Sequence, residues 1–420
     1  MEQMNKLLTT KLEGMKFLLR ALRYRNYRLF FLGQGVSLIG SWMQTIAISW
    51  LTYRLTNSAF LLGMVAFMSQ IPVIIFSPFA GVLADRLNRK NILIVTQTFL
   101  MLGAFILAIL CFLKIIQVWH IIFLSTLLGL TNALDIPTRQ AFVVDMVEDK
   151  KDLGNAIALN SFILNSARLI GPSIAGILIA AVGEGICFLL NGISFLAIIF
   201  ALFAMKIHPA NKNNHEQHIF EDLKDGLLYA FHHIQIRYIL LLVTLVSLMG
   251  MSYAVLMPVF AKEVLGGGAS TLGFLMGATG LGAIVGAAYL ASRTNILELP
   301  KTISLAGAIF GLGLIAFSFS RYLWLSLILM LCVGFTMIAQ MVSSNILIQN
   351  LTADDKRGRV MSLYTISFMG MVPFGSLLAG SLASKIGAPH ALIISGLSCV
   401  MGSLFFSLKI SSFRTIHQKN

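Results

Sequence analysis

Two charged residues, Asp135 and Arg168, lie inside long apolar stretches, and they are the side chains best placed to do chemistry. A charge within hydrocarbon costs at least about 2.5–3.5 kcal/mol, so each should face a protein interior and have a partner. An Asp135–Arg168 pair would couple protonation to conformation, because a protonated carboxyl loses its attraction for the guanidinium. Two alternatives remain open: a purely structural ion pair, and a pair between Asp135 and the nearby Arg139.

Uncharged side chains inside the apolar stretches are a second set of candidates. Those expected to line a substrate cavity are Gln34, Met43, Gln44, Asn132, Asn165, Gln340 and Asn345. The polar members of this set could equally hydrogen-bond one helix to another.

The composition says what must position these residues. Of 420 residues, 57% are apolar and only 11% charged, whereas soluble domains carry about 25% charged residues. The missing charge indicates a surface covered by lipid. The net charge of +14 lies in short gaps between apolar runs and not on polar domains, so we expect no nucleic-acid partner. The four cysteines fall inside apolar runs, and no metal site, cofactor or disulfide framework is predicted.

Twelve apolar runs are long enough to span a bilayer as helices, since about 20 residues cross its core. They lie near 29–53, 60–84, 92–113, 119–143, 156–181, 186–207, 237–260, 271–292, 301–319, 322–347, 360–384 and 389–409. The predicted organisation is a basic leader (1–28), a six-helix bundle (29–207), a polar linker with an amphipathic helix (208–236), a second six-helix bundle (237–409) and a tail (410–420). Asp149-Lys150 and Asp355-Lys356 lie half a chain apart, as expected of a duplicated unit.

The distribution of Lys and Arg predicts the orientation, because cytoplasmic loops hold the excess positive charge. With both termini cytoplasmic, only Arg54, Lys114, Lys262, Arg321 and Lys385 of the 31 basic residues fall on the outer side. Arg168 is within a span, and the other 25 face the cytoplasm. We therefore expect a multi-pass protein of the cytoplasmic membrane, in contact with lipid and monomeric.

The first cytoplasmic connection, Gly81-Val-Leu-Ala-Asp85-Arg86-Leu-Asn88-Arg89-Lys90, resembles the signature between helices two and three of the major facilitator superfamily. Asn88 replaces the usual Gly and can adopt a left-handed backbone. The resemblance implies a gate that closes the cytoplasmic side. Asp85 would then face the positive helix end near Val360, and Arg89 could pair with Asp145. Further gate candidates are Gly81, Arg86, Lys90, Arg139, Arg357 and Arg359.

Three more segments resemble the branch that includes the enterobactin exporter and drug/proton antiporters. They are 22–44, 133–141 and 355–362. In the fifth span, Gly171, Pro172 and Gly176 partly match the Gly-Pro motif of superfamily antiporters. Pro172 would kink the helix, while the glycines admit a neighbouring helix closely.

The predicted function is therefore secondary active export of a small molecule, by alternating access and driven by proton antiport. The resemblance implies a siderophore or an amphiphilic drug as the substrate. Alternatives are a lipid or lysolipid translocator on the same fold, and a non-transporting membrane partner or sensor. An enzyme is not expected, because no cluster of catalytic residues and no ATP-binding loop is present.

Overall fold

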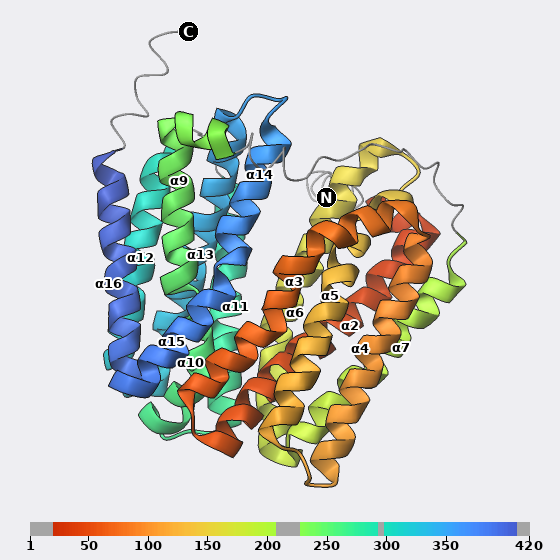
Figure 1. Ribbon diagram of the computed structural model, residues 1–420, viewed down its shortest axis with the longest axis horizontal. Coiled ribbons are helices and arrows are strands. Elements are labelled where there is room, and N and C mark those ends of the chain that lie inside the picture. The colour runs from red at the N-terminus through yellow and green to blue at the C-terminus, as the bar shows by residue number, and fades with distance from the viewer. Residues whose placement is uncertain (1–19, 207–226, 293–297, 410–420) are drawn as a thin grey trace, which may run out of the picture.

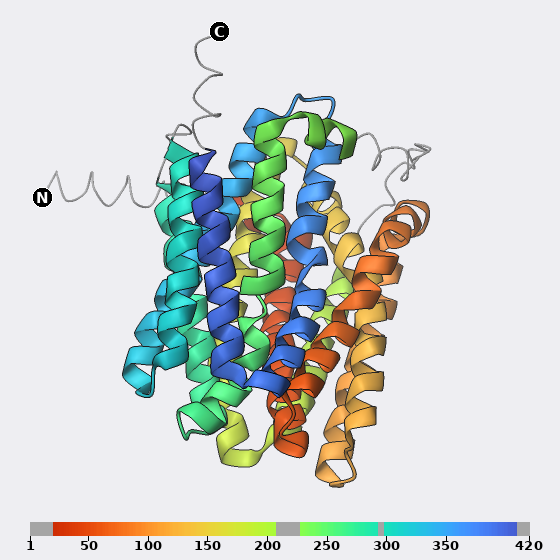
Figure 2. The same ribbon diagram turned by 60° about the vertical axis from the view of Figure 1, so that its left-hand side comes forward.

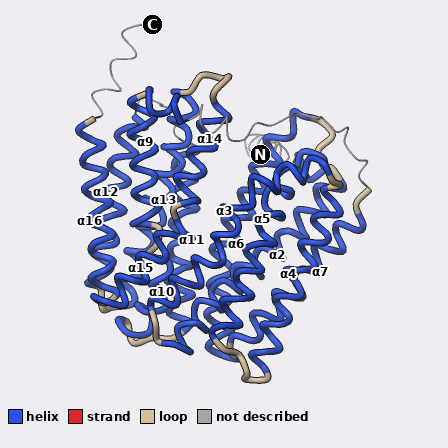
Figure 3. Tube along the Cα trace, in the orientation of Figure 1, coloured by secondary structure: helices blue, strands red, loops and turns tan. Residues whose placement is uncertain are grey.

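The computed structural model describes residues 20–206, 227–292 and 298–409, and these form long helices joined by short connections (Figures 1 and 3). The predicted all-helical membrane fold of two six-helix bundles is confirmed. Figure 1 shows the two bundles side by side, one formed by α2 to α7 and the other by α9 to α16.

The first bundle consists of six helices. They are α2 (Arg25–Thr56), α3 (Ala59–Arg86), α4 (Arg89–Phe112), α5 (Val118–Asp145), α6 (Leu153–Val182) and α7 (Glu184–Ala204), with 3-10 turns η1 (Arg20–Arg23) and η2 (Lys150–Asp152). Helices α3 to α7 each include a stretch long and apolar enough to cross a membrane. Helix α2 carries more polar residues and completes this bundle by packing against α6 and α7.

The second bundle contains four uninterrupted helices and two composite spans. The uninterrupted helices are α11 (Ala269–Ala291), α12 (Leu299–Phe319), α13 (Leu323–Leu351) and α16 (Ala388–Leu408). One composite span joins α9 (Ile234–Leu245), η3 (Val246–Gly250), α10 (Tyr253–Val259) and η4 (Phe260–Val264), and the other joins α14 (Arg357–Thr365), η6 (Ile366–Gly370) and α15 (Val372–Ile386). The segments η3, η4 and η6 are π-helical turns, which often mark functional regions of helices.

Both described ends of the chain lie at the same end of the molecule. The start of α2, the end of α16 and the segments on either side of 207–226 are found there (Figures 1 and 2). We call this the linker end and the opposite one the far end. Most of the predicted leader, linker and tail lies outside the described residues.

The two bundles approach most closely toward the far end. A Cβ atom on Gly63 of α3 would lie 2.5 Å from the Ser376 carbonyl oxygen of α15, and Phe67 packs edge to face on Phe374 with ring centroids 5.6 Å apart. Helices α6 and α11 also meet closely, because a Cβ on Gly176 would lie 2.8 Å from the Gly273 Cα atom. From these contacts the bundles diverge toward the linker end (Figure 1).

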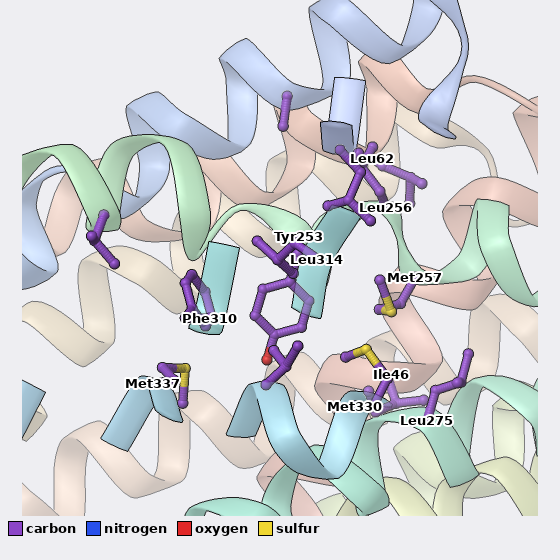
Figure 4. Close-up of a cluster of buried hydrophobic side chains, with 14 of the residues drawn as sticks. Ile46, Leu62, Tyr253, Leu256, Met257, Leu275, Phe310, Leu314, Met330 and Met337 are labelled. Atoms are coloured by element: carbon purple, nitrogen blue, oxygen red, sulfur yellow. The ribbon is translucent and has the colours of Figure 1, made fainter. Parts of the chain in front are cut away.

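The apolar core is continuous between the bundles where they meet. Figure 4 shows Ile46 and Leu62 of the first bundle near Met257, Tyr253 and Leu256 of the second. All five are at least 97% buried. Dispersion contacts and side-chain shape, in place of water exclusion, hold such a contact together within a bilayer.

Candidate functional site

Asp135 lies within the first bundle, on the side of α5 that faces α4. Its side chain is 1% exposed. Its Oδ1 atom accepts hydrogen bonds from the Thr96 hydroxyl at 2.8 Å and from Gln97 Nε2 at 2.7 Å. Arg139, one turn along α5, places Nη2 3.4 Å from Asp135 Oδ2, which is an ion pair and not a well-formed hydrogen bond. The carboxylate is thus partnered entirely from its own bundle.

The hypothesis of an Asp135–Arg168 pair is wrong for this conformation. The structure favours the alternative that pairs Asp135 with Arg139. The reason is geometric: Asp135 lies about 15 Å from the linker end of α5, and Arg168 about 22 Å from the linker end of α6, at 1.5 Å per residue. Asp135 also turns toward α4, whereas Arg168 turns toward the second bundle.

Arg168 lies at the junction between the bundles, half-way along α6. Its guanidinium carbon is 5.7 Å from the ring centre of Trp42 in α2, and its Nη2 atom is 3.9 Å from the Met337 sulfur in α13. The Tyr253 hydroxyl of α10 interacts with both Arg168 and Thr279. Within the described part of the chain, no carboxylate forms an ion pair with Arg168.

One face of α6 changes from exposed to buried at the position of Arg168. On the linker side of it, Gly154, Ala158 and Ser161 are exposed and Asn165 is partly exposed. On the far side of it, Leu169, Pro172 and Gly176 continue the same helical face. There α6 packs against α11, where a Cβ on Gly280 would lie 2.9 Å from the Leu169 Cα atom. The face that contacts the second bundle is therefore accessible from the linker end as far as Arg168.

The cavity candidates fall into two groups. Gln34, Met43, Gln44 and Gln340 are buried, with exposures of 2%, 4%, 6% and 0%. Gln44 accepts a hydrogen bond from Asn191 Nδ2 of α7 at 2.8 Å, so it joins two helices and does not line a cavity here. Asn132, Asn165 and Asn345 are partly exposed. Asn165 bonds only the Ser161 carbonyl oxygen in its own helix, so its carboxamide oxygen is left available to a ligand.

The segment from Gly81 to Lys90, which comprises the end of α3, a short turn and the start of α4, lies at the linker end. The predicted Arg89–Asp145 pair is present, with Nη1 3.0 Å from Oδ1, and Lys90 donates to the Met205 carbonyl oxygen at 2.8 Å. The side chain of Asp85 is outside the described residues. A Cβ on Gly81 or on Gly358 would meet nothing within 4 Å, and Arg357 pairs with its neighbour Asp354. The gate residues of the two bundles are therefore apart. Arg86 is exposed and Arg359 is partly exposed.

Asn88 does not adopt the expected left-handed conformation. Its φ of −72° and ψ of 110° are extended, and its side-chain oxygen accepts from the Asn91 backbone N–H at 3.3 Å. Asn88 is thus the N-cap of α4, a position at which Asn is among the preferred residues. The short polar side chain is used for capping, and no glycine-like backbone is needed.

The predicted close approaches at Gly171 and Gly176 are present. A Cβ on Gly171 would lie 2.5 Å from the Trp42 Cβ atom, so this glycine admits α2, while Gly176 admits α11 of the other bundle. Pro172 lies within α6 between them and is buried. The small residues thus let α6 pack against both bundles.

Polar side chains join the bundles at the rim of the far end. The Tyr53 hydroxyl donates to Glu263, and Lys262 Nζ donates to Asn57 Oδ1 at 2.6 Å. Lys262 also lies 5.5 Å above the Tyr53 ring. Arg54 pairs with Glu184 within the first bundle, with Nε 2.7 Å from Oε1.

Sequence reasoning missed Thr96, Gln97 and Asn191. Each is a polar residue inside an apolar run, which is the signal that could have drawn attention to them. Their partners could not be predicted, because the rotation of α4 and α7 about their axes is set by packing. The same applies to Tyr253, which lies beside Arg168 although 85 residues separate the two in the sequence.

The class of protein follows from this arrangement. Two six-helix bundles that meet at one end, with polar residues at their junction, define a transporter of the major facilitator type. The chain belongs to the transmembrane secretion effector family of that superfamily, whose family model matches residues 18–419.

Named relatives carry related functions. The chain is 28% identical over 379 residues to the staphyloferrin A transporter of Staphylococcus aureus, covering 90% of this chain and 94% of the relative. It is 23% identical to macrolide efflux protein A of Streptococcus pyogenes, covering 89% and 94%. It is 22% identical to the multidrug efflux pump Tap of Mycolicibacterium fortuitum, covering 85% and 88%. The chain is thus a multi-pass membrane transporter of the efflux type and not an enzyme.

Solved structures share the fold. A bacterial homologue of the human lysosomal transporter Spinster, in an inward-facing and occupied conformation, superposes with a TM-score of 0.71 and 12% identity over 93% of this chain and 97% of that one. The nucleoside transporter NupG gives a TM-score of 0.68 with 13% identity, over 92% and 98%. At such identities the likeness concerns the fold alone.

Proposed function

We propose that this protein exports a small molecule, a siderophore or an amphiphilic drug-like compound, across the cytoplasmic membrane by alternating access. The observation that carries the proposal is the face of α6. It is exposed at Gly154, Ala158 and Ser161, partly exposed at Asn165, and buried from Pro172 onward, where α6 packs against α11. A substrate can therefore reach the middle of the molecule from one side only, as alternating access requires.

We take the linker end to face the cytoplasm, with both termini on that side. The arrangement of basic residues supports this orientation, because Arg86, Arg89, Lys90 and Arg357 all lie at the linker end. Short loops rich in Lys and Arg stay in the cytoplasm. In this orientation the structure is open to the cytoplasm, the side from which an exporter takes its substrate.

Closing the linker end would bring the gate residues together. Gly81 and Gly358 lie in open space, so the start of α14 can approach the loop after α3 without a steric clash. Asp85 would then face the N-terminal end of α14, where unpaired backbone N–H groups favour an anion. The Arg89–Asp145 pair would hold that loop in position throughout.

Asp135 is the candidate proton carrier. Of the residues that the structure describes, it is the only acidic one within the apolar core of a span, and its carboxylate is buried beside Thr96, Gln97 and Arg139. Protonation would release Arg139, whose side chain is 20% exposed and lies nearer the linker end. A change of charge on Asp135 would thereby reach the gate. Proton antiport rests on this arrangement.

Flux measurements in proteoliposomes test both parts of the proposal. Purified protein is reconstituted with a proton gradient imposed, and export of compounds is followed by mass spectrometry of the lumen and the medium. Asp135→Asn should retain passive exchange of substrate but lose gradient-driven accumulation, by at least tenfold. Thr98→Val serves as the control, since the Thr98 hydroxyl bonds only its own helix at the Ile94 carbonyl oxygen. Gradient-driven accumulation at the wild-type level in a folded Asp135→Asn protein would refute the coupling role.

Comparing strains tests export in cells. Deletion of the gene should remove one or more compounds from the medium, under iron-poor growth if the substrate is a siderophore. An unchanged medium in both iron-poor and iron-replete growth would contradict export.

A further inference from the structure

The charge on Arg168 defines the chemical class of the exported compound. We propose that Arg168 binds an anionic group of the substrate, a carboxylate or a group of similar charge and shape. This inference rests on the proposed export function and adds to it the sign of the substrate charge.

The position of Arg168 is central in every direction. It is the fifteenth residue after Leu153, so about 22 Å of α6 lies on its linker side and about 21 Å on its far side. Trp42, Tyr253 and Met337 approach it from α2, α10 and α13, so elements of both bundles contact one guanidinium. A group bound there contacts both bundles at once, as a transported substrate must.

The acidic residues of the described part of the chain are all engaged elsewhere or lie near the membrane faces. Asp135 is held by Thr96, Gln97 and Arg139. Glu184 and Glu263 are at the far end, while Asp145 and Asp152 are at the linker end. The Trp42 ring, the Tyr253 hydroxyl and the Met337 sulfur are neutral. Among the residues that the structure describes, the positive charge of Arg168 is therefore not compensated.

An uncompensated charge at this depth within a membrane-spanning helix is costly. An anion from solution removes this cost, since guanidinium and carboxylate match in two parallel N–H···O bonds. The low dielectric around Trp42 and Met337 strengthens the attraction. A cationic compound would meet repulsion at the same place.

Access and additional polar groups support the assignment. The exposed face of α6 leads from the linker end to Arg168, and Asn165 lies one turn before it on that face. Asn165 donates to the Ser161 carbonyl oxygen of its own helix, and no hydrogen bond to its carboxamide oxygen is formed within the described residues. Trp42 offers an aromatic surface for an apolar part of the substrate. A soluble anion that enters from the cytoplasm therefore reaches Arg168 without crossing lipid.

The first test requires no variant. Medium from the host strain and from its deletion strain is fractionated on an anion exchanger at pH 7, and the compounds are quantified by mass spectrometry. We expect the compounds that fall by at least tenfold to carry a net or local negative group. Loss of cationic or neutral compounds alone would overturn the anionic class and leave export intact. A medium that is unchanged refutes export itself, and the present inference with it.

Variants test the residue. The deletion strain is complemented with wild type, Arg168→Gln, Arg168→Lys, or the control Arg321→Gln, which changes an exposed arginine at the far end. At equal amounts in the membrane, Arg168→Gln should restore less than a tenth of the anion export. Arg168→Lys should restore an intermediate fraction, because the charge remains but the paired geometry is lost. Arg321→Gln should restore it fully.

Two results would overturn the role of Arg168. The first result is anion export by the Arg168→Gln variant at the wild-type level. The other is a change confined to acidic lipids of the membrane fraction, with the medium unaffected, which would identify a lipid headgroup as the anion. If the Arg168→Gln protein fails to accumulate in the membrane, anion export by Arg168→Lys is compared with the wild type instead. Export equal to the wild type would contradict a contact through two parallel hydrogen bonds, and an intermediate level of export would support it.

Discussion

The glycine contact between α6 and α11 should set the balance between the two access states. A Cβ on Gly273 would lie 2.6 Å from the Pro172 carbonyl oxygen and 2.8 Å from the Gly176 Cα atom. In Gly273→Val the helices must separate by about 0.8 Å, from 2.6 Å to the 3.4 Å at which ordinary contact begins. A state open at the far end would have to separate α6 from α11 and lose this contact. Gly273→Val should therefore favour the opposite state.

The magnitude follows from the cost of overpacking. Extra methyl groups in a well-packed contact cost about 1–3 kcal/mol, which corresponds to a shift of about 5- to 150-fold in the ratio of the two states. The backbone on both sides is helical and cannot yield locally, so we expect the middle or upper part of this range. Transport should slow in proportion, because return to the state open at the linker end becomes less favourable.

Distance measurements between spin labels can detect the shift. Gly154 and Gly358 lie at the linker end of opposite bundles, and a Cβ at either position meets nothing within 4 Å. Nitroxides on Gly154→Cys and Gly358→Cys should give mainly a long distance in the parent protein. Gly273→Val should increase a shorter component at least fivefold.

The matched control is Gly268→Val, also at the far end. Gly268 has an extended backbone (φ −120°), and its Cβ would meet no atom within 4 Å. An unchanged distance distribution in folded Gly273→Val protein would refute the reasoning. An equal shift in Gly268→Val would show that the effect is not caused by the α6–α11 contact.

Substitutions test three further contacts. Gln44→Leu should lower the free energy of unfolding by about 0.6–1.7 kcal/mol, as measured by thermal melts in detergent. The double variant Gln44→Leu with Asn191→Leu should lose less stability than the sum of the losses in the two single variants. Additive losses would exclude a hydrogen bond between the two side chains. Glu263→Gln should raise labelling of a far-end cysteine by about 1.4- to 5-fold, because polar pairs near the surface contribute about 0.2–1 kcal/mol. An unchanged labelling rate would show that the rim does not hold the far end closed. Arg89→Asp should slow transport, and the double variant Arg89→Asp with Asp145→Arg should recover the transport rate. A double variant as slow as the single variant would argue against an ion pair between these residues.

The spans could be predicted from sequence because lipid imposes a length and a composition on each helix. The boundaries differ from the prediction by a few residues, as in α2, which begins at Arg25 instead of Leu29, and α13, which ends at Leu351 instead of Leu347. The extra turns contain polar residues that lie beyond the hydrocarbon. Hydropathy therefore indicates which residues lie in lipid and underestimates the length of the helix.

The partners inside the bundles could not be predicted to the same degree. Asp135 and Arg168 were identified by their charge, but their pairing depends on how each helix is rotated and on how far along its axis each residue lies. Arg89–Asp145 could be anticipated because the family motif relates the two residues. No comparable pattern links Gln44 to Asn191, or Arg168 to Trp42, and these contacts required the three-dimensional structure.

The π-helical turn η6 has a consequence for insertions and deletions in the eleventh span. A π turn contains one residue more than the α-helical turn that it replaces, so the helix beyond it is rotated by about 100° relative to an uninterrupted helix. Deleting one residue from Ile366–Gly370 would leave a continuous helix of nearly the same length. It would, however, turn α15 about its axis and carry Gly380 away from Gly63. In this span the register of the chain, and not only its composition, decides which face meets the other bundle.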